Sequence, residues 1–208
     1  SSYVRKRIFT NFCHSWYVKH RENPMSHHQA LPAGARKAEN LTLTGRERRL
    51  EGDDIIVSKT DIHGKITYVN SVFIDISGYT EAEMLGAPHA VIRHPHMPRA
   101  VFKLLWDTLE SGKEIFAYVI NRCKNGDHYW VMAHVTPSYT LDGKLFGYHS
   151  SRRSPRPDAV AAVWPIYQQL YELEQRLGRK EGLDASTAAL HRLLEEHDVS
   201  YEKFVLSI

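Results

Sequence analysis

The sequence predicts an α+β fold with an antiparallel sheet, because of the order in which strand-like and helix-like segments follow one another. Two strand-like segments joined by a tight turn come first, at residues 55–60 and 65–69. Short helical segments follow, and three more strand-like segments then occur in succession, at residues 115–122, 128–139 and 145–153. Successive strands joined by tight turns pair antiparallel, and helices grouped between two runs of strands are typical of α+β domains.

Turn and cap residues mark the ends of the first elements. Gly64 closes the turn of the first hairpin and can adopt the positive φ angle that a tight turn requires. A short helix is predicted over residues 70–76, where three apolar residues fall on one side and Gly78 follows. Thr80 and Glu83 have the spacing of a capping box, which predicts a second short helix.

A longer helix is predicted over residues 98–111, before Gly112. The residues of its inner face recur three and four positions apart, and they are Val101, Leu104, Leu105, Thr108 and Leu109. The three strands after this helix are joined by Lys-Asn-Gly-Asp at residues 124–127 and by Leu-Asp-Gly-Lys at residues 141–144. Both sequences are typical of hairpin turns.

The C-terminal residues 156–208 are predicted to form a helical tail. Asp158 is the expected N-cap of a first helix, a break is expected over residues 178–182, and a second amphipathic helix is expected over residues 186–197. The apolar stripe of the first helix consists of Val160, Val163, Ile166, Tyr167, Leu170, Leu173 and Leu177. Such a stripe packs either onto its own domain or onto a second protein chain.

The N-terminal residues 1–50 mix basic residues, histidine, proline and glycine with no sustained period. This composition predicts a poorly ordered extension, with a short charged helix over residues 46–53. We therefore expect three parts: the extension, one domain over residues 51–155, and the helical tail over residues 156–208.

Composition places the chain among soluble globular proteins, with 42% hydrophobic and 25% charged residues in 208. No run of 18 apolar residues occurs, so we expect no membrane span. The net charge of +3 comes largely from the first 50 residues, which gives little reason to expect nucleic-acid binding. The two cysteines, Cys13 and Cys123, match no disulfide framework and no metal spacing, which favours a reducing compartment and a cytoplasmic protein.

A stretch at residues 87–109 combines polar side chains with a stiff backbone. Arg93, His94 and His96 stand beside apolar residues, and two prolines restrict the chain around them. Donors that are held rigidly beside an apolar wall suit a buried ligand with polar edges, because each buried donor must find a partner.

Several motifs occur together and in order. They are ITYVNSVFIDISGYTEAEMLG, PHAVIRHPHMP followed by FKLLWDTLESGK, NRCKNGDHYWVMAHVTP and GKLFGYHSSR. Together they resemble a PAS domain and, more narrowly, the FAD-binding PAS sensor of the bacterial aerotaxis receptor family. The resemblance covers residues 54–153 and continues into AAVWPIY of the following helix.

This resemblance implies a five-stranded antiparallel sheet with the order 2-1-5-4-3 and FAD clamped between the sheet and the short helices. It also implies a sensor whose flavin follows oxygen or electron-transport flux and signals to chemotaxis machinery. At His96 the chain departs from the family, which usually has Asp there, so an acceptor is replaced by a group that can donate or accept. The residues that match flavin-binding positions of the family are Asn70, Arg93, His94, Trp106, Asn121 and Tyr129.

The side-chain chemistry agrees with these roles. Arg93 can bind a pyrophosphate or a flavin carbonyl with two N–H groups, Trp106 offers a flat face, and Asn121 both donates and accepts. Each residue also has a structural explanation: Trp106 as core packing, Asn70 as a helix N-cap, and Arg93 as an ion-pair partner. The carboxylates considered for that ion pair are Asp75, Glu81 and Glu83.

Other functions stay open at this point. No nucleophile is paired with a base in a recognisable frame, so we expect no enzyme. A cofactor-free PAS interaction module and a haem-based gas sensor are the alternatives. The candidate haem ligands are His89, His94, His128, His134 and His149.

The expected partners follow from motifs that the sequence lacks. It contains no kinase motif, no cyclase motif and no membrane-spanning run. We therefore expect the chain to signal in trans to a chemoreceptor or another signalling output protein, and to form a homodimer. For the same reason we expect the apolar stripe of the first tail helix to be an interaction surface.

Overall fold

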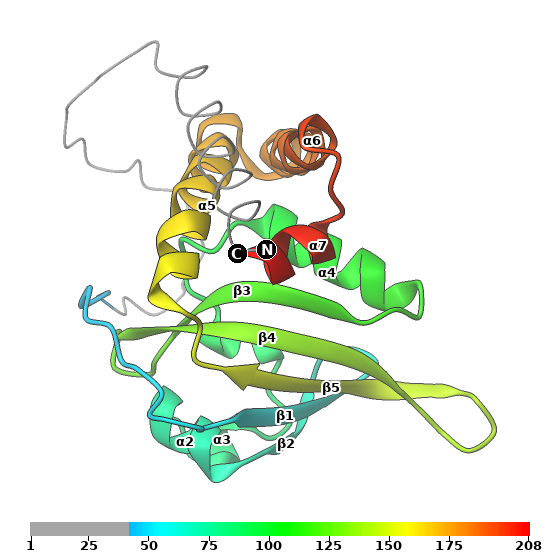
Figure 1. Ribbon diagram of the computed structural model, residues 1–208. Helices are drawn as coiled ribbons and strands as arrows, with labels where there is room; N and C mark the ends of the chain where they lie inside the picture. Colours follow the sequence, from blue (N-terminus) through cyan, green and yellow to red (C-terminus); the bar gives the residue numbers. More distant parts are fainter. Residues whose placement is uncertain (1–41) are drawn as a thin grey trace.

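The computed structural model describes residues 42–208, and its centre is one antiparallel sheet (Figure 1). The strand order is β2-β1-β5-β4-β3, as predicted. All five predicted strands are confirmed, because hairpin turns and alternating side chains set their limits locally. Their bounds are β1 Ile56–Asp61, β2 Ile66–Val69, β3 Ile115–Arg122, β4 His128–Tyr139 and β5 Leu145–Arg153.

The predicted short helices connect β2 to β3. Asn70 caps α2 by accepting the N–H of Phe73, and Gly78 ends this helix with a φ of 73°. Thr80 and Glu83 form the expected capping box of α3. The helices of this region are α2 Ser71–Ser77, α3 Glu81–Met84, the 3-10 helix η1 His89–Ile92, and α4 Arg99–Glu110.

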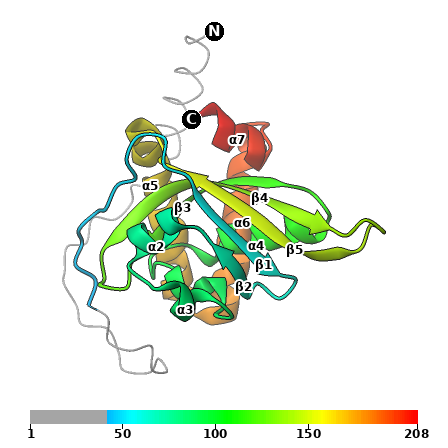
Figure 2. The same ribbon diagram turned by 90° about the horizontal axis from the view of Figure 1, so that it is seen from below.

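The strand register fixes which side chains face these helices. Asn121 of β3 pairs with Tyr129 of β4, and Ala117 pairs with Ala133 two steps along the same face. The two alanines carry only methyl groups, so the centre of this inner face stays open. In Figures 1 and 2 the β4–β5 hairpin extends beyond the rest of the sheet, and Leu141 at its tip is fully exposed.

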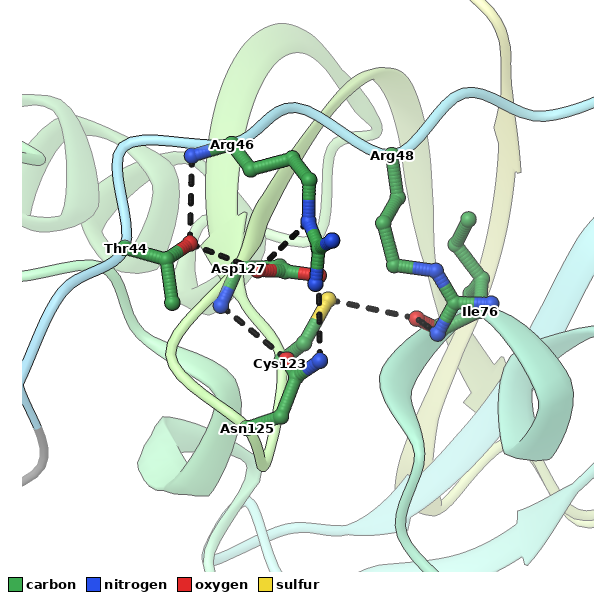
Figure 3. A network of polar contacts seen from close by, with 7 residues as sticks. All are labelled: Thr44, Arg46, Arg48, Ile76, Cys123, Asn125 and Asp127. Atoms are coloured by element: carbon green, nitrogen blue, oxygen red, sulfur yellow. Dashed lines mark hydrogen bonds and ion pairs between the residues drawn. The ribbon is translucent and has the colours of Figure 1, made fainter.

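The prediction of a short helix over residues 46–53 is wrong, because these residues form no helix. Residues 44–48 are not helical and lie along the β3–β4 hairpin, where the N–H of Thr44 donates to the carbonyl of Gly126 (3.1 Å) and the N–H of Arg48 to that of His128 (2.7 Å). Figure 3 shows Thr44 and Arg46 both turned toward Asp127. The rest of the expected extension, residues 1–41, lies outside the described residues.

The contacts of this N-terminal segment explain its conformation. Asp127 is buried, accepts the hydroxyl of Thr44 at 2.6 Å and pairs with Arg46 at 3.0 Å. These two hydrogen bonds lower the pKa of Asp127 to about 2. A Cβ at Gly126 would lie 2.3 Å from the carbonyl oxygen of Thr42, so only glycine allows this approach. A helix would forfeit all of these bonds.

Three helices follow the sheet, at bounds that differ from those predicted. They are α5 Pro157–Leu177, α6 Arg179–Glu196 and α7 Tyr201–Ser207. Arg156 is the N-cap of α5 and Asp158 lies within its first turn, because Pro157 occupies the first helical position, where a missing N–H costs nothing. The break is Gly178 alone, and α7, which was not predicted, is capped by Ser200.

The early start of α6 has a packing reason. Gly182 lies inside this helix where it crosses α5, and a Cβ there would be 2.6 Å from the carbonyl oxygen of Glu174. Glycine usually breaks helices, but here it permits two helices to approach closely.

The apolar stripe of α5 is covered by the chain itself. The hydroxyl of Tyr167 donates to the carbonyl of Tyr118 on β3 at 2.7 Å, and Trp164 packs edge-to-face on Trp130 of β4. Figure 1 shows α5, α6 and α7 gathered beyond the β3 edge of the sheet. The prediction that this stripe is an interaction surface is therefore wrong for its buried members, which are Val163, Ile166, Tyr167 and Leu170.

No helix between residues 42 and 208 combines the length and the apolar character that crossing a bilayer requires.

Candidate functional site

A cavity of about 200 Å³ lies between the inner face of the sheet and helices η1 and α4. All strands of the sheet except β2 contribute to its lining. Its apolar walls include Leu105, Trp106 and Leu109 from α4 and Val119, Ala133 and Val135 from the sheet. Its polar lining includes Ser58, Thr60, His89, Arg93, Asn121 and Arg152. Flat apolar walls with a few polar groups are typical of sites for planar organic molecules.

Three of the six predicted site residues line this cavity: Arg93, Trp106 and Asn121. Arg93 and Asn121 form an isolated antiparallel bridge, which places the proline-containing loop against the edge strand β3. Trp106 packs edge-to-face on Tyr148 with ring centroids 5.4 Å apart. The structure therefore brings together a guanidinium, an indole and an amide that are up to 28 residues apart in the sequence.

The guanidinium of Arg93 stacks on a ring and forms no ion pair within the described part of the chain. It lies 3.9 Å from the centroid of Phe102, and its Nε has no hydrogen-bond partner. Burial lowers the pKa of Arg93. The ion pair considered with Asp75, Glu81 or Glu83 is not formed, so this side chain remains able to bind a ligand.

Asn70 does not line the cavity, and its side chain is used within the protein. Its Oδ1 accepts the N–H groups of Val57 and Phe73, and its Nδ2 donates to the carbonyl of Ile55 at 2.7 Å. Asn70 therefore caps α2 and joins it to the chain around β1.

His94 lies outside the cavity in a group of aromatic rings. It is buried, its Nδ1 accepts the N–H of His96 at 3.2 Å, and its ring centroid is 5.8 Å from that of His128. His96 in turn packs against Tyr171 of α5. Burial, reinforced by the neighbouring imidazoles, lowers the pKa of His94 to about 4.

Tyr129 is buried on the inner face of β4 beside Asn121, but it is not part of the cavity lining. Its hydroxyl has no hydrogen-bond partner in the structure. Burial raises the pKa of Tyr129, so the hydroxyl stays neutral.

Arg152 was not among the predicted residues, and it lines the cavity from β5. Its side chain is 2% exposed, one Nη donates to the hydroxyl of Ser58, and the guanidinium lies 4.2 Å from the ring of Phe73. A signal was available: Arg152 shares strand phase with Tyr148 and Ser150, so alternation places it on the inner face.

His89 was considered as a haem ligand and is the one of those five candidates that lines the cavity. Its Nε2 lies 3.3 Å from the hydroxyl of Ser58. Burial, together with the charges of Arg152 and Arg93, lowers the pKa of His89 to about 3. At neutral pH this imidazole is therefore uncharged.

The electrostatic character of the cavity is positive. Among the described residues, its lining contains two guanidinium groups, from Arg93 and Arg152, and no Asp or Glu. Buried charges in proteins are normally paired, so this arrangement suits a planar ligand with acceptor atoms or negative charge.

Comparison with known proteins agrees with the fold. Residues 66–151 match the family model described as the PAS fold. These residues have the PAS fold, with the sheet order expected from the sequence.

Curated relatives narrow the similarity. The chain is 42% identical to the aerotaxis receptor of Escherichia coli K12 over 128 residues, which are 62% of this chain and 25% of that protein. It is 27% identical to the nitrogen fixation regulatory protein of Klebsiella pneumoniae over 128 residues, 62% of this chain and 23% of that one. The chain is thus similar to one part of the aerotaxis receptor, and it spans about a quarter of the length of these relatives.

Among solved structures, the light-state structure of the LOV domain of the blue-light photoreceptor Aureochrome1 aligns with a TM-score of 0.46 at 22% identity. The alignment covers 58% of this chain and 91% of that structure.

Proposed function

We propose that this PAS domain binds FAD non-covalently in the cavity and senses oxygen or the redox state of the cell. The observation that carries the proposal is the convergence of Trp106, Asn121 and Arg93 on one cavity between the sheet and α4. They supply a flat face, a paired donor and acceptor, and a cation, which are the groups that bind an isoalloxazine nucleotide.

The cavity suits the ring system better than the whole nucleotide. Ligand pockets usually measure about 300–1,000 Å³, and this one measures about 200 Å³. The isoalloxazine would therefore fill the slot between the sheet and α4, and the ribityl and nucleotide parts would lie toward its mouth. Arg93 comes from the loop that leads to α4, so it is placed to bind the charged part of the ligand.

The other three predicted residues are assigned a supporting part. Asn70 fixes α2 against β1, His94 packs the proline-containing loop against His128, and Tyr129 on β4 lies beside Asn121. Each holds an element that lines the cavity, and none is expected to contact the flavin ring.

The similarity to the aerotaxis receptor supports a signalling role. We propose that the domain reports the state of its flavin to a chemoreceptor or another output protein in trans, that it acts in the cytoplasm, and that the chain forms a homodimer. Size-exclusion chromatography with light scattering measures the oligomeric state, and a monomer at micromolar concentration would contradict the dimer.

A second candidate, haem-based gas sensing, is favoured by one observation: His89 lines the cavity. Its Nε2 contacts the hydroxyl of Ser58, so haem ligation through this nitrogen would require that contact to break.

The absorption spectrum of the purified protein tests these proposals together. Bound FAD gives the two visible bands of oxidised flavin, and denaturation releases it intact for identification by chromatography. A Soret band would indicate haem. A colourless protein that binds neither added FAD nor added haem would contradict both proposals and leave an interaction module.

A further inference from the structure

Arg152 is a buried cation without a counter-ion. Its side chain is 2% exposed, and among residues 42–208 it makes one hydrogen bond, donated by Nη2 to the hydroxyl of Ser58. Within the same residues its Nε and Nη1 have no partner, and no carboxylate lines the cavity that it faces. Removing an unpaired charge from water is costly, so such a group normally has a role that supplies the missing partner.

The surroundings of Arg152 hold it in place without neutralising it. The ring of Phe73 supports its guanidinium from one side, at 4.2 Å from the ring centroid. The neighbouring polar groups are Ser58, His89 and Tyr129, all uncharged at neutral pH. Burial lowers the pKa of Arg152 to about 10, so the group is still protonated under physiological conditions.

We propose that Arg152 and Ser58 form an anion subsite on the sheet side of the cavity, and that this subsite favours the negatively charged reduced form of the flavin. The inference rests on the proposed function. It adds a residue that sets the charge of the bound cofactor. This residue comes from β5, whereas Arg93 comes from the loop after η1.

This subsite would influence the two-electron reduction of the flavin. Oxidised flavin takes two electrons and one proton from a reductant and solution, and becomes a reduced flavin with one negative charge. A second proton would make the reduced flavin neutral. A fixed cation nearby stabilises the anion, raises the reduction potential and makes the second protonation less favourable.

The test uses the FAD-loaded protein and the variant Arg152→Met, which keeps the length of the side chain and removes its charge. In the wild type, the bound flavin takes up one proton for two electrons on reduction, even at a pH where free reduced FAD is neutral. Its midpoint potential therefore changes with pH half as steeply as that of a couple that takes up two protons for two electrons. In Arg152→Met the preference for reduced over oxidised flavin falls at least tenfold, which is a shift of about 30 mV to a more negative potential. Arg152→Lys keeps the charge and most of the potential.

Several outcomes overturn the inference. The first is an unchanged potential and proton uptake in Arg152→Met. If this variant does not fold, the wild type alone decides, because uptake of two protons for two electrons at that same pH shows a neutral reduced flavin and removes the need for an anion subsite.

A second measurement distinguishes failure of this inference from failure of the proposed function. If the purified protein binds no flavin, thermal unfolding is measured with sodium benzoate and with neutral benzamide. Stabilisation by benzoate alone, lost in Arg152→Met, supports an anion subsite without flavin, whereas equal behaviour of the two compounds overturns it.

Discussion

The carboxylate of Glu174 on α5 caps the N-terminus of α4. It accepts the backbone N–H of Arg99 at 3.1 Å and that of Ala100 at 3.0 Å, and it binds the Nε of Arg99 at 2.9 Å. The N-cap of α4 is Pro98, which has no side-chain hydrogen bond to offer. A residue from another helix therefore replaces the local cap and supplies a negative charge at the positive end of the helix.

This contact joins the cavity to the C-terminal helices. The helix that Glu174 caps carries Trp106, and Ser186 of α6 donates to the same carboxylate at 2.9 Å. Arg99 also donates to the carbonyl of Gly178 between α5 and α6. A displacement of α4 at the cavity would therefore change the contacts that link α4 to α5 and α6.

We expect Glu174→Ala to lower the free energy of unfolding by about 3 kcal/mol, because it leaves the N–H groups of Arg99 and Ala100 without an acceptor and the half-buried guanidinium of Arg99 without its carboxylate. Glu174→Gln keeps an acceptor and should cost less. Urea denaturation measures both. Asp107→Asn, which removes the exposed pair with Lys103, is the control and should change little. Equal stability of Glu174→Ala and the wild type would contradict the proposed capping.

Trp106→Ala should lower flavin occupancy at least tenfold while the far-UV circular dichroism spectrum stays unchanged. Trp106 faces the cavity, and its loss removes the flat wall against which the ring would pack. Trp164→Ala is a matched control, because Trp164 is also half-buried and packs edge-to-face on an aromatic residue, but on the outer side of the sheet. Occupancy is the ratio of flavin to protein absorbance. A similar loss in both variants would indicate a general effect on folding.

Asn70→Ala and Asn121→Ala should distinguish a residue that stabilises the fold from a residue that binds the flavin. Asn70→Ala removes the cap of α2 and is expected to cost about 1 kcal/mol of stability with unchanged flavin occupancy. Asn121→Ala removes a cavity-lining amide and should lower occupancy with a smaller effect on stability. Thermal unfolding and flavin content are measured on the same samples. The reverse pattern would show that Asn70 is the ligand contact.

The buried His94 should make stability depend on pH. Its pKa is lowered from 6.5 to about 4 in the folded protein, so the unfolded chain binds more protons between these values. The free energy of unfolding is therefore constant above pH 6.5 from this group and falls as pH drops toward 4. His94→Phe should reduce this fall, although His89 contributes in the same direction. The control is His191→Phe, with an exposed side chain on α6.

Protonation of Asp127 should lower the free energy of unfolding in a second, more acidic pH range. Its pKa is lowered from 3.8 to about 2 by Thr44 and Arg46, so its contribution to stability is present above about pH 4 and is lost as pH falls toward 2. In Asp127→Asn the slope of stability between pH 4 and 2 should be smaller. Asp75→Asn, an exposed position on α2, serves as control. An identical slope in Asp127→Asn and the wild type would show that the N-terminal segment does not depend on this carboxylate.

Local sequence determined the sheet and the short helices of this protein. The turns at Gly64 and at residues 124–127, and the caps at Asn70 and Thr80, act over a few residues, so they are readable without a structure. The motif match predicted Arg93, Trp106 and Asn121, which the fold brings to one cavity.

Only the tertiary structure decided the remaining features. The N-terminal segment lies along the β3–β4 hairpin because Asp127, more than 80 residues away, accepts hydrogen bonds from its side chains. Helix α4 is capped by Glu174, and Gly182 is helical because α5 crosses α6 there. Arg152 is a buried cation, and it is unpaired because no carboxylate of the described residues lines the cavity. Periodicity and turn chemistry describe what a residue prefers locally, whereas pairing, close approach and missing counter-charges depend on which distant segments the fold places beside it.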